Sequence, residues 1–321
     1  MTTTASVAQV ARTSPIFATV KLDESLVPFD DTVPYRPLAE HLHLTPATRP
    51  SARRRATNMV ARMFGPHAVA GLGSLYLTAR EGTPCGVRFD DGLWIHSYPE
   101  GVVVDTKVRA RSAADLDTTA RDVFLAHHVP GPGETVVDVG AGSGSVARLF
   151  SSLVGPSGRV VAVEAHPTTF RCLRRTVELN ELFNVDIVEA AVVGVPGPVL
   201  LHDDAADHRI TATDGFADIA LAVAGRRLGE ILDSLGVGRV NLLKMNIEGS
   251  ELSALAGAAD WLSQVDNLVV SCHDFRANGD DRMRTFAPVA ALLREAGFQL
   301  RTRPNDTRPP IPYYLYASRA A

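Results

Sequence analysis

The sequence is poor in lysine, in cysteine and in long apolar runs. Of its 32 lysine and arginine residues only three are lysines, and the net charge of −4 gives no basic excess for binding a nucleic-acid backbone. No apolar run approaches the roughly 18 residues of a membrane span, and the N-terminus lacks a basic start followed by an apolar core. The three cysteines, Cys85, Cys172 and Cys272, have neither a paired nor a metal-binding spacing. These absences predict a cytoplasmic protein without a nucleic-acid or membrane partner.

A glycine is also missing where a dinucleotide-binding turn would need it. The stretch from Glu134 to Ser145, ETVVDVGAGSGS, predicts a buried strand, a tight turn and the start of a helix. A dinucleotide-binding turn has glycine at positions one, three and six, and the sixth position counted from Gly140 is Ser145. The pattern present is Asp-x-Gly-x-Gly-x-Gly, whose glycines Gly140, Gly142 and Gly144 let a ligand approach the backbone closely. The helix that follows would point its N-terminal amides at that ligand.

Two acids accompany this turn. Asp138 precedes the first glycine by two residues and suits a ligand with a positive end, such as the ammonium of an amino acid, better than a pyrophosphate. Glu164 ends the next apolar run, 24 positions after Gly140 (164 − 140 = 24), which is about one strand–helix–strand step. A carboxylate at that strand tip can accept hydrogen bonds from both hydroxyls of a ribose, so Glu164 is the expected ribose ligand.

The chain divides into three parts by composition. Residues 1–55 are rich in Thr, Ser, Ala and Pro, which predicts an arm that is partly disordered or wraps the rest of the chain. Residues 56–110 show short alternating patterns, which predict a small β-rich accessory region. Strands are expected there at 70–78, 86–89, 93–96 and 102–104.

Residues 111–321 alternate between strand and helix patterns, which predicts an α/β domain with a mostly parallel sheet covered on both faces. Strands are expected at 135–139, 159–164, 185–189, 198–202, 240–247, 266–272, 298–303 and 312–317. Helices are expected at 113–128, 144–154, 168–180, 226–235, 249–263 and 284–296. The last two strands follow one another without a helix, so they predict an antiparallel hairpin at one edge of the sheet.

One strand pattern carries polar residues where a central strand is normally apolar. In Leu242-Leu-Lys-Met-Asn-Ile-Glu-Gly249, the residues Lys244, Asn246 and Glu248 share one side at period two. Ligands of open α/β sheets bind beyond the carboxyl ends of the strands, where Asn246 and Glu248 are expected. A purely structural alternative is open for Lys244, which would neutralise Glu248 or Asp138 in a buried ion pair. His273 ends the next strand pattern and is the expected general base, because an imidazole accepts protons near neutral pH. A hydrogen-bonded structural role for His273 is the alternative.

These motifs resemble the FkbM family of class I methyltransferases over roughly residues 105–302. The similarity is carried by four stretches: Val137-Asp-Val-Gly-Ala-Gly142, Val163-Glu-Ala-His-Pro167, Asn184-Val-Asp-Ile-Val-Glu-Ala-Ala-Val192 and Leu243-Lys-Met-Asn-Ile-Glu-Gly-Ser-Glu251. The resemblance implies a Rossmann-like seven-stranded sheet, bound S-adenosyl-L-methionine and methylation of a hydroxyl on a small molecule, such as a secondary metabolite or a sugar.

The resemblance also implies roles for individual residues. The cofactor-binding residues would be Asp138, Gly140, Ala141, Gly142, Gly144, Glu164, Ala165, Glu189, Ala190 and Asn246. The catalytic residues would be His273, Glu248 and Lys244. The family usually has Asp where this chain has Asn246, which weakens a role for that position as a base or metal ligand.

Three alternatives are left open by the sequence. A nicotinamide oxidoreductase is disfavoured by Ser145 and Asp138, and a non-catalytic cofactor-binding module is suggested by Asn246. The side chains of Asn246, Glu248, His273 and Asp274 would also suit a divalent metal, although no metal is expected because Asn replaces Asp. The sequence does not specify the identity of the acceptor. It also leaves the oligomeric state open, with a homodimer as one alternative.

Overall fold

The computed structural model describes residues 25–30, 52–204, 209–211, 220–277 and 283–319. Its main sheet has eight strands in the order β1-β14-β15-β13-β12-β5-β6-β7. The strands are β1 Val27–Pro28, β5 Thr135–Val139, β6 Arg159–Glu164, β7 Val185–Glu189, β12 Val240–Met245, β13 Val265–Ser271, β14 Phe298–Thr302 and β15 Tyr314–Arg319. The five from β13 to β7 are parallel, whereas β14 and β15 form the expected antiparallel edge. The Rossmann-like α/β prediction is thus confirmed, with β1 as an eighth, two-residue strand paired to β14.

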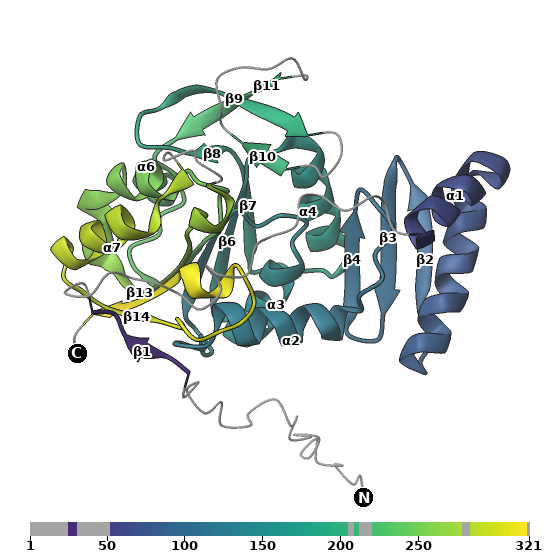
Figure 1. Cartoon of the computed structure of the whole chain (residues 1–321), viewed down its shortest axis with the longest axis horizontal. Coiled ribbons are helices and arrows are strands. Elements are labelled where there is room, and N and C mark those ends of the chain that lie inside the picture. The colour runs from purple at the N-terminus through teal and green to yellow at the C-terminus, as the bar shows by residue number, and fades with distance from the viewer. Residues whose placement is uncertain (1–24, 31–51, 205–208, 212–219, 278–282, 320–321) are drawn as a thin grey trace, which may run out of the picture.

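Helices cover both faces of this sheet (Figure 1). They are α2 Ala113–Phe124, α3 Ser145–Val154, α4 Pro167–Leu179, α5 Leu228–Ser234, α6 Glu251–Ala256 and α7 Phe286–Glu295. Strand side chains alternate between the two resulting cores, as the pleat requires. Val136 packs with α2, α3 and α4, whereas its neighbour Val137 packs with α5, α6 and α7. Strands buried on both faces explain the nearly continuous apolar runs of the sequence.

A separate sheet of β2 Gly86–Asp90, β3 Leu93–Tyr98 and β4 Gly101–Asp105 makes up the accessory region, between α1 Ala52–Glu81 and α4 (Figure 1). Helix side chains cap both of its edges. Ser74 and Thr78 of α1 exchange hydrogen bonds with the backbone of Val87 in β2 and of Cys85 just before it. On the other edge Asn180 exchanges hydrogen bonds with Val102, and Thr176 accepts one from the N–H of Val104. These edges therefore have no free row of backbone groups for another strand to join.

The strand expected at 70–78 is wrong, because these residues lie in α1. Val69, Ala70 and Leu77 are buried against the small sheet while Leu72 and Leu75 are exposed, which is helical spacing. The glycines of this segment gave it the look of short strands and turns. The only non-helical backbone inside α1 is at Gly65, where the helix kinks.

A third sheet lies between β7 and α5 in the sequence. It consists of β8 Ala191–Val192, β9 Gly197–Asp204, β10 Arg209–Thr211 and β11 Ala220–Arg226, in the order β10-β9-β11-β8. The sequence predicted only the strand at 198–202 of this group. Figure 1 shows the sheet lying across one end of the main sheet.

Two further elements differ from the expectation. β12 ends at Met245, so Asn246 and Glu248 belong to the turn after it. The helix expected at 249–263 is divided into α6 and a 3-10 helix, η3 Ala259–Gln264. Two more 3-10 helices, η4 Asp274–Arg276 and η6 Ile311–Tyr313, follow β13 and precede β15. No helix in the described part of the chain is long and apolar enough to cross a membrane.

Candidate active site

The glycine turn between β5 and α3 is built around backbone conformations that side chains disfavour. Gly140, Gly142 and Gly144 all have positive φ, at 77°, 59° and 84°. A Cβ on Gly140 would lie far inside van der Waals contact of the Asn246 carbonyl oxygen, whereas one on Gly142 would meet nothing within 4 Å. The turn is fixed to β6 because the N–H groups of residues 140 and 141 both donate to the carbonyl of Val163. It thus leaves open space beside Gly142.

Asp138 and Lys244 form a buried ion pair beneath this turn. They lie opposite each other on β5 and β12, with Nζ 2.8 Å from Oδ1 and side chains 0% and 3% exposed. Lys244 also donates to the Gly140 carbonyl at 2.7 Å. Neither oxygen of Asp138 has an aligned hydrogen bond among the described residues, so charge is what holds this carboxylate to the lysine. The contact is the buried ion pair that the sequence left open as a structural role for Lys244. Through the Gly140 carbonyl, the pair also supports the glycine turn.

Glu164 lies at the tip of β6, where the sequence places it. Its Oε2 accepts from Gly142 N and its Oε1 from His166 N, both at 2.9 Å. Burial raises the pKa of this carboxyl, although the two backbone N–H groups oppose the rise. A carboxylate has about four lone-pair positions, so both oxygens retain capacity for further donors.

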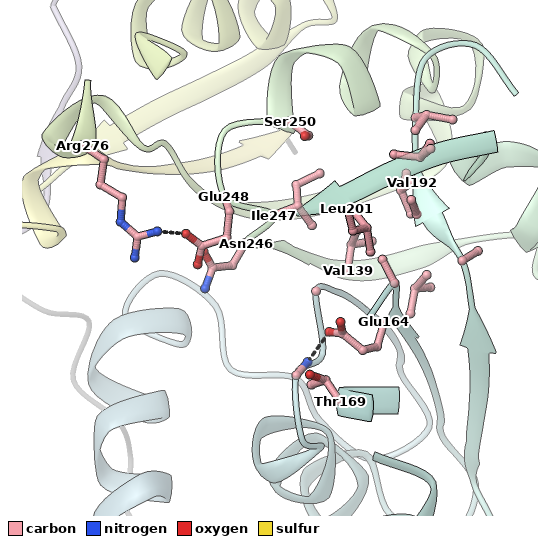
Figure 2. A pocket seen from close by; sticks show the side chains of 18 residues that line it. Val139, Glu164, Thr169, Val192, Leu201, Asn246, Ile247, Glu248, Ser250 and Arg276 are labelled. Atoms are coloured by element: carbon pink, nitrogen blue, oxygen red, sulfur yellow. Dashed lines mark hydrogen bonds and ion pairs between the residues drawn. The ribbon is translucent and has the colours of Figure 1, made fainter. Parts of the chain in front are cut away.

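A pocket of about 390 Å³ opens beside these groups, within the range of small-molecule sites (Figure 2). Seven predicted residues line it: Gly140, Gly142, Glu164, Ala165, Ala190, Asn246 and Glu248. Six others do not: Asp138, Ala141, Gly144, Glu189, Lys244 and His273. In Figure 2 Glu164 lies at one end of the pocket and the Glu248–Arg276 ion pair at the other, with Val139 and Leu201 between them.

A second turn, after β12, presents Glu248 to the pocket. Glu248 has φ 58°, a conformation that costs a non-glycine residue free energy, and Gly249 follows at φ 106°. The buried carboxylate of Glu251 holds this turn, since its Oε1 accepts from the N–H of Ile247 at 3.2 Å and from that of Gly249 at 3.1 Å. A carboxylate at the start of α6 therefore stabilises the strained backbone at Glu248.

His273 lies behind the pocket wall, between two glutamates. Its Nδ1 is 2.8 Å from Glu251 Oε1 and its Nε2 is 3.4 Å from Glu248 Oε2, with a side chain only 2% exposed. The Nδ1 contact is within ion-pair distance but is not aligned as a hydrogen bond. Glu248, which Arg276 binds from the other side, therefore separates His273 from the pocket.

The side chains considered for a metal serve other purposes. Asp274 accepts from the N–H groups of Thr285 and Phe286 at the start of α7, both at 2.9 Å. Burial raises the pKa of this carboxyl, and those same N–H groups oppose it. Within the described ranges no three His, Cys, Asp or Glu side chains are arranged as metal ligands.

Several site residues were not predicted. The apolar cover comes from the third sheet, through Val192, Val199 and Leu201. The alternation of Val199 and Leu201 toward the pocket with exposed Leu200 is a period-two signal that the sequence did contain. Glu251 ends one of the stretches that carry the family resemblance, but no role was predicted for it. Arg276 had no signal, because its contact with Glu248 joins two separate segments.

Comparison with known proteins identifies the family. The family model described as "Methyltransferase FkbM domain" matches residues 138–300. The chain is 29% identical over 249 residues to "Methyltransferase 1" of Beauveria bassiana, covering 67% of this chain and 95% of that protein. It is 30% identical over 211 residues to "31-O-demethyl-FK506 methyltransferase FkbM" of Streptomyces tacrolimicus, covering 54% and 76%. A crystal structure of methyltransferase FkbM from Methylobacillus flagellatus aligns with a TM-score of 0.39 and 22% identity, covering 57% of this chain and 43% of that one. These matches favour neither the oxidoreductase nor the non-catalytic alternative.

The pocket fits the cofactor of this family. Glu164 offers acceptors for the ribose hydroxyls, the glycine turn leaves room at Gly142, and Ala165 and Ala190 present little bulk beside them. The cofactor supplies a methyl group already activated on a sulfonium. The chain belongs to the FkbM family of S-adenosylmethionine-dependent methyltransferases.

Proposed function

We propose that the enzyme methylates a hydroxyl on a small molecule, such as a secondary metabolite or a sugar moiety, in the cytoplasm. The observation that supports this most directly is the row formed by Glu248 on the pocket wall, His273 behind it and Glu251 behind that. A hydroxyl must lose its proton as its oxygen takes the methyl group, and this row offers proton acceptors separated by 3.4 Å and 2.8 Å. The name of the Streptomyces tacrolimicus relative, 31-O-demethyl-FK506 methyltransferase, also indicates that this relative methylates an oxygen.

The cofactor, held by Glu164 and the glycine turn, would supply a methyl group activated on its sulfonium, and the acceptor oxygen would take that methyl group while a neutral thioether leaves. The hydroxyl donates its hydrogen bond to Glu248, the group that lines the pocket. The proton then passes from Glu248 to His273, whose Nε2 is 3.4 Å from the carboxylate. Lys244 contributes from a distance by holding the glycine turn through the Gly140 carbonyl. Positioning of the hydroxyl supplies much of the rate, and proton removal supplies the rest.

The first test is to identify the product. The enzyme is incubated with methyl-labelled cofactor and small-molecule extracts, and each labelled product is located by mass and by NMR. A new methyl ether is the expected result. Label found only on nitrogen, carbon or sulfur would contradict the proposal.

The second test uses that acceptor to examine the proton path. His273→Ala and Glu248→Gln should each lower turnover by about 10²- to 10⁴-fold while leaving cofactor affinity nearly unchanged. His128→Asn is the matched control, because His128 also contacts a glutamate, Glu134 at 3.0 Å, but lies outside the pocket. Normal turnover by folded His273→Ala protein would remove His273 from the mechanism.

A further inference from the structure

The segment between β4 and α2 places an arginine against the glycine turn. Nη2 of Arg109 donates to the hydroxyl of Ser143 at 3.1 Å, and Ser143 is the residue between Gly142 and Gly144. The Arg109 side chain is 28% exposed, so it is partly accessible to solvent. A cation from the accessory part of the chain thus reaches the cofactor-binding turn.

The position of Arg109 is fixed by His96 and Asp105, two residues of the accessory sheet. Its backbone N–H donates to Nε2 of His96 at 2.9 Å, and Nδ1 of the same ring is 3.3 Å from the carbonyl of Val103. Burial lowers the pKa of His96 to about 4, so the ring is neutral near pH 7 and accepts at Nε2 while it donates at Nδ1. Asp105, four residues earlier in the sequence, forms an ion pair with the Arg109 side chain. This support aims the guanidinium at the turn before any ligand arrives.

The charge distribution around the turn indicates what this cation binds. Of the other cations described there, Lys244 is buried against Asp138 and Gly140, and Arg276 is paired with Glu248. A guanidinium has five N–H donors; the Ser143 hydroxyl takes one, and Nε faces Asp105 as an ion pair without an aligned hydrogen bond, so donors remain for a ligand. The cofactor carries a single carboxylate, on its methionyl end, and a fork of N–H donors suits a carboxylate well.

We propose that Arg109, beside Ser143, binds the carboxylate of the methionyl end of the cofactor. Glu164 at the tip of β6 then holds the ribose, and the ligand extends from there along the glycine turn to the accessory segment. The accessory region consequently contributes a ligand-binding residue to the methyltransferase domain. This inference depends on the cofactor pocket but not on the nature of the methyl acceptor.

Two cofactor-derived probes differ in the amino-acid end, which carries both a carboxylate and an ammonium group. S-adenosylhomocysteine has this end, whereas 5′-methylthioadenosine has the adenosine thioether without it. A guanidinium attracts the carboxylate and repels the ammonium, so a loss confined to S-adenosylhomocysteine reports on the carboxylate. Calorimetry should show Arg109→Ala weakening S-adenosylhomocysteine binding by about 10- to 150-fold, with the affinity for methylthioadenosine nearly unchanged. Arg109→Lys should recover part of the loss, because it keeps the charge but not the fork. Lys107→Ala, which removes an exposed cation two residues away, should change neither affinity.

Three results would overturn the proposal. Equal losses for both probes in Arg109→Ala, or in Arg109→Gln if the alanine variant does not fold, would make Arg109 only a support for the turn. A carboxylate-dependent loss in Arg276→Ala but not in the Arg109 variants would move the subsite to the Glu248 end of the pocket. Failure of wild-type protein to bind either probe would refute the pocket itself, whereas failure to find a methyl ether product would leave these binding results intact.

Discussion

Two turns at neighbouring strand tips make opposite use of the same unusual backbone conformation. The turn after β5 reaches positive φ with glycines, whereas the turn after β12 does so with Glu248, a residue that pays a conformational cost there. The first is fixed mainly by backbone contacts and by Lys244 beneath it. The second is fixed by a buried side chain, Glu251. The turn after β5 therefore leaves room for close approach of a ligand, and the turn after β12 presents a carboxylate to the pocket.

The strained non-glycine backbone at Glu248 therefore lies where the proposed proton transfer occurs. A glycine at 248 would relieve the backbone but would remove the carboxylate from the pocket wall. Strained non-glycine residues are stable only where their surroundings over-determine them, and Glu251 with Arg276 provides those surroundings. We therefore expect the two turns to respond differently to substitution.

The largest effect is expected from Gly140→Ala, which tests the close approach of the two turns. Its Cβ would overlap the Asn246 carbonyl, so neither turn can keep its place, and the unfolding free energy should fall by more than about 4 kcal/mol. Gly142→Ala is the control: it has a similar φ but open space, and should cost about 1–2 kcal/mol. Denaturant unfolding measures both, and equal losses would show that φ alone, and not the contact between turns, is responsible.

The second-largest effect is expected from Asp138→Ala, which should lower the unfolding free energy by about 3–5 kcal/mol because it leaves Lys244 buried without a counter-charge. If Asp138 were instead a cofactor ligand with little structural role, the variant would melt normally and only lose affinity. The double variant Asp138→Ala, Lys244→Met should recover part of the stability, since it removes the unpaired charge. A double variant as unstable as the sum of the two single ones would mean that the pair is not coupled.

The sequence predicts the first turn better than the second for a physical reason. Gly140, Gly142 and Glu164 line the pocket at the strand tips where the sequence places them, because turn chemistry and the length of one strand–helix–strand step are local properties. For Asp138 the sequence left both a ligand contact and an ion pair with Lys244 open, because periodicity alone cannot show which residue lies opposite it on the neighbouring strand.

The second turn and the accessory region depend on contacts that the sequence does not reveal. β12 was extended past Met245 because nothing local signals that Glu251 will draw the chain into a turn. The helix over 70–78 was missed because its burial pattern is defined by the sheet it covers. The support of Arg109 by His96 likewise joins residues that only the fold brings together.

Glu251→Ala tests the second of the two turns, the one after β12. It leaves the N–H groups of Ile247 and Gly249 without their acceptor, so the unfolding free energy should fall by about 3 kcal/mol. Turnover should fall further than stability explains, because Glu248 and His273 lose their common support. Glu251→Gln keeps an acceptor for both N–H groups and should restore stability but only part of the turnover. Full activity in Glu251→Ala at a temperature where it is folded would show that the carboxylate merely fills space.

The smallest expected effect concerns His96, the anchor that connects the glycine turn to the accessory sheet through Arg109. The folded pKa of about 4 lies below the ordinary 6.5, so between these values the unfolded chain binds a proton that the folded protein does not. Stability should therefore fall as the pH drops from about 6.5 to 4, by about 2 kcal/mol at pH 5 from this residue alone. Burial also lowers the pKa of His127 to about 4, which adds a slope of the same sign.

His96→Phe separates the two contributions, because it keeps a ring in the buried site but removes the proton. The variant should be less stable than wild type at pH 7, where the contacts to Arg109 and Val103 are lost. Its decline between pH 6.5 and 4 should nevertheless be shallower, because the contribution of His96 is gone while that of His127 remains. Buried carboxyls with raised pKa, such as Glu164, act in the opposite direction but are common to both proteins and cancel in the difference. Parallel curves of unfolding free energy against pH would show that His96 does not enter the folded protein as a neutral acceptor, and the fixed orientation of Arg109 would lose its basis.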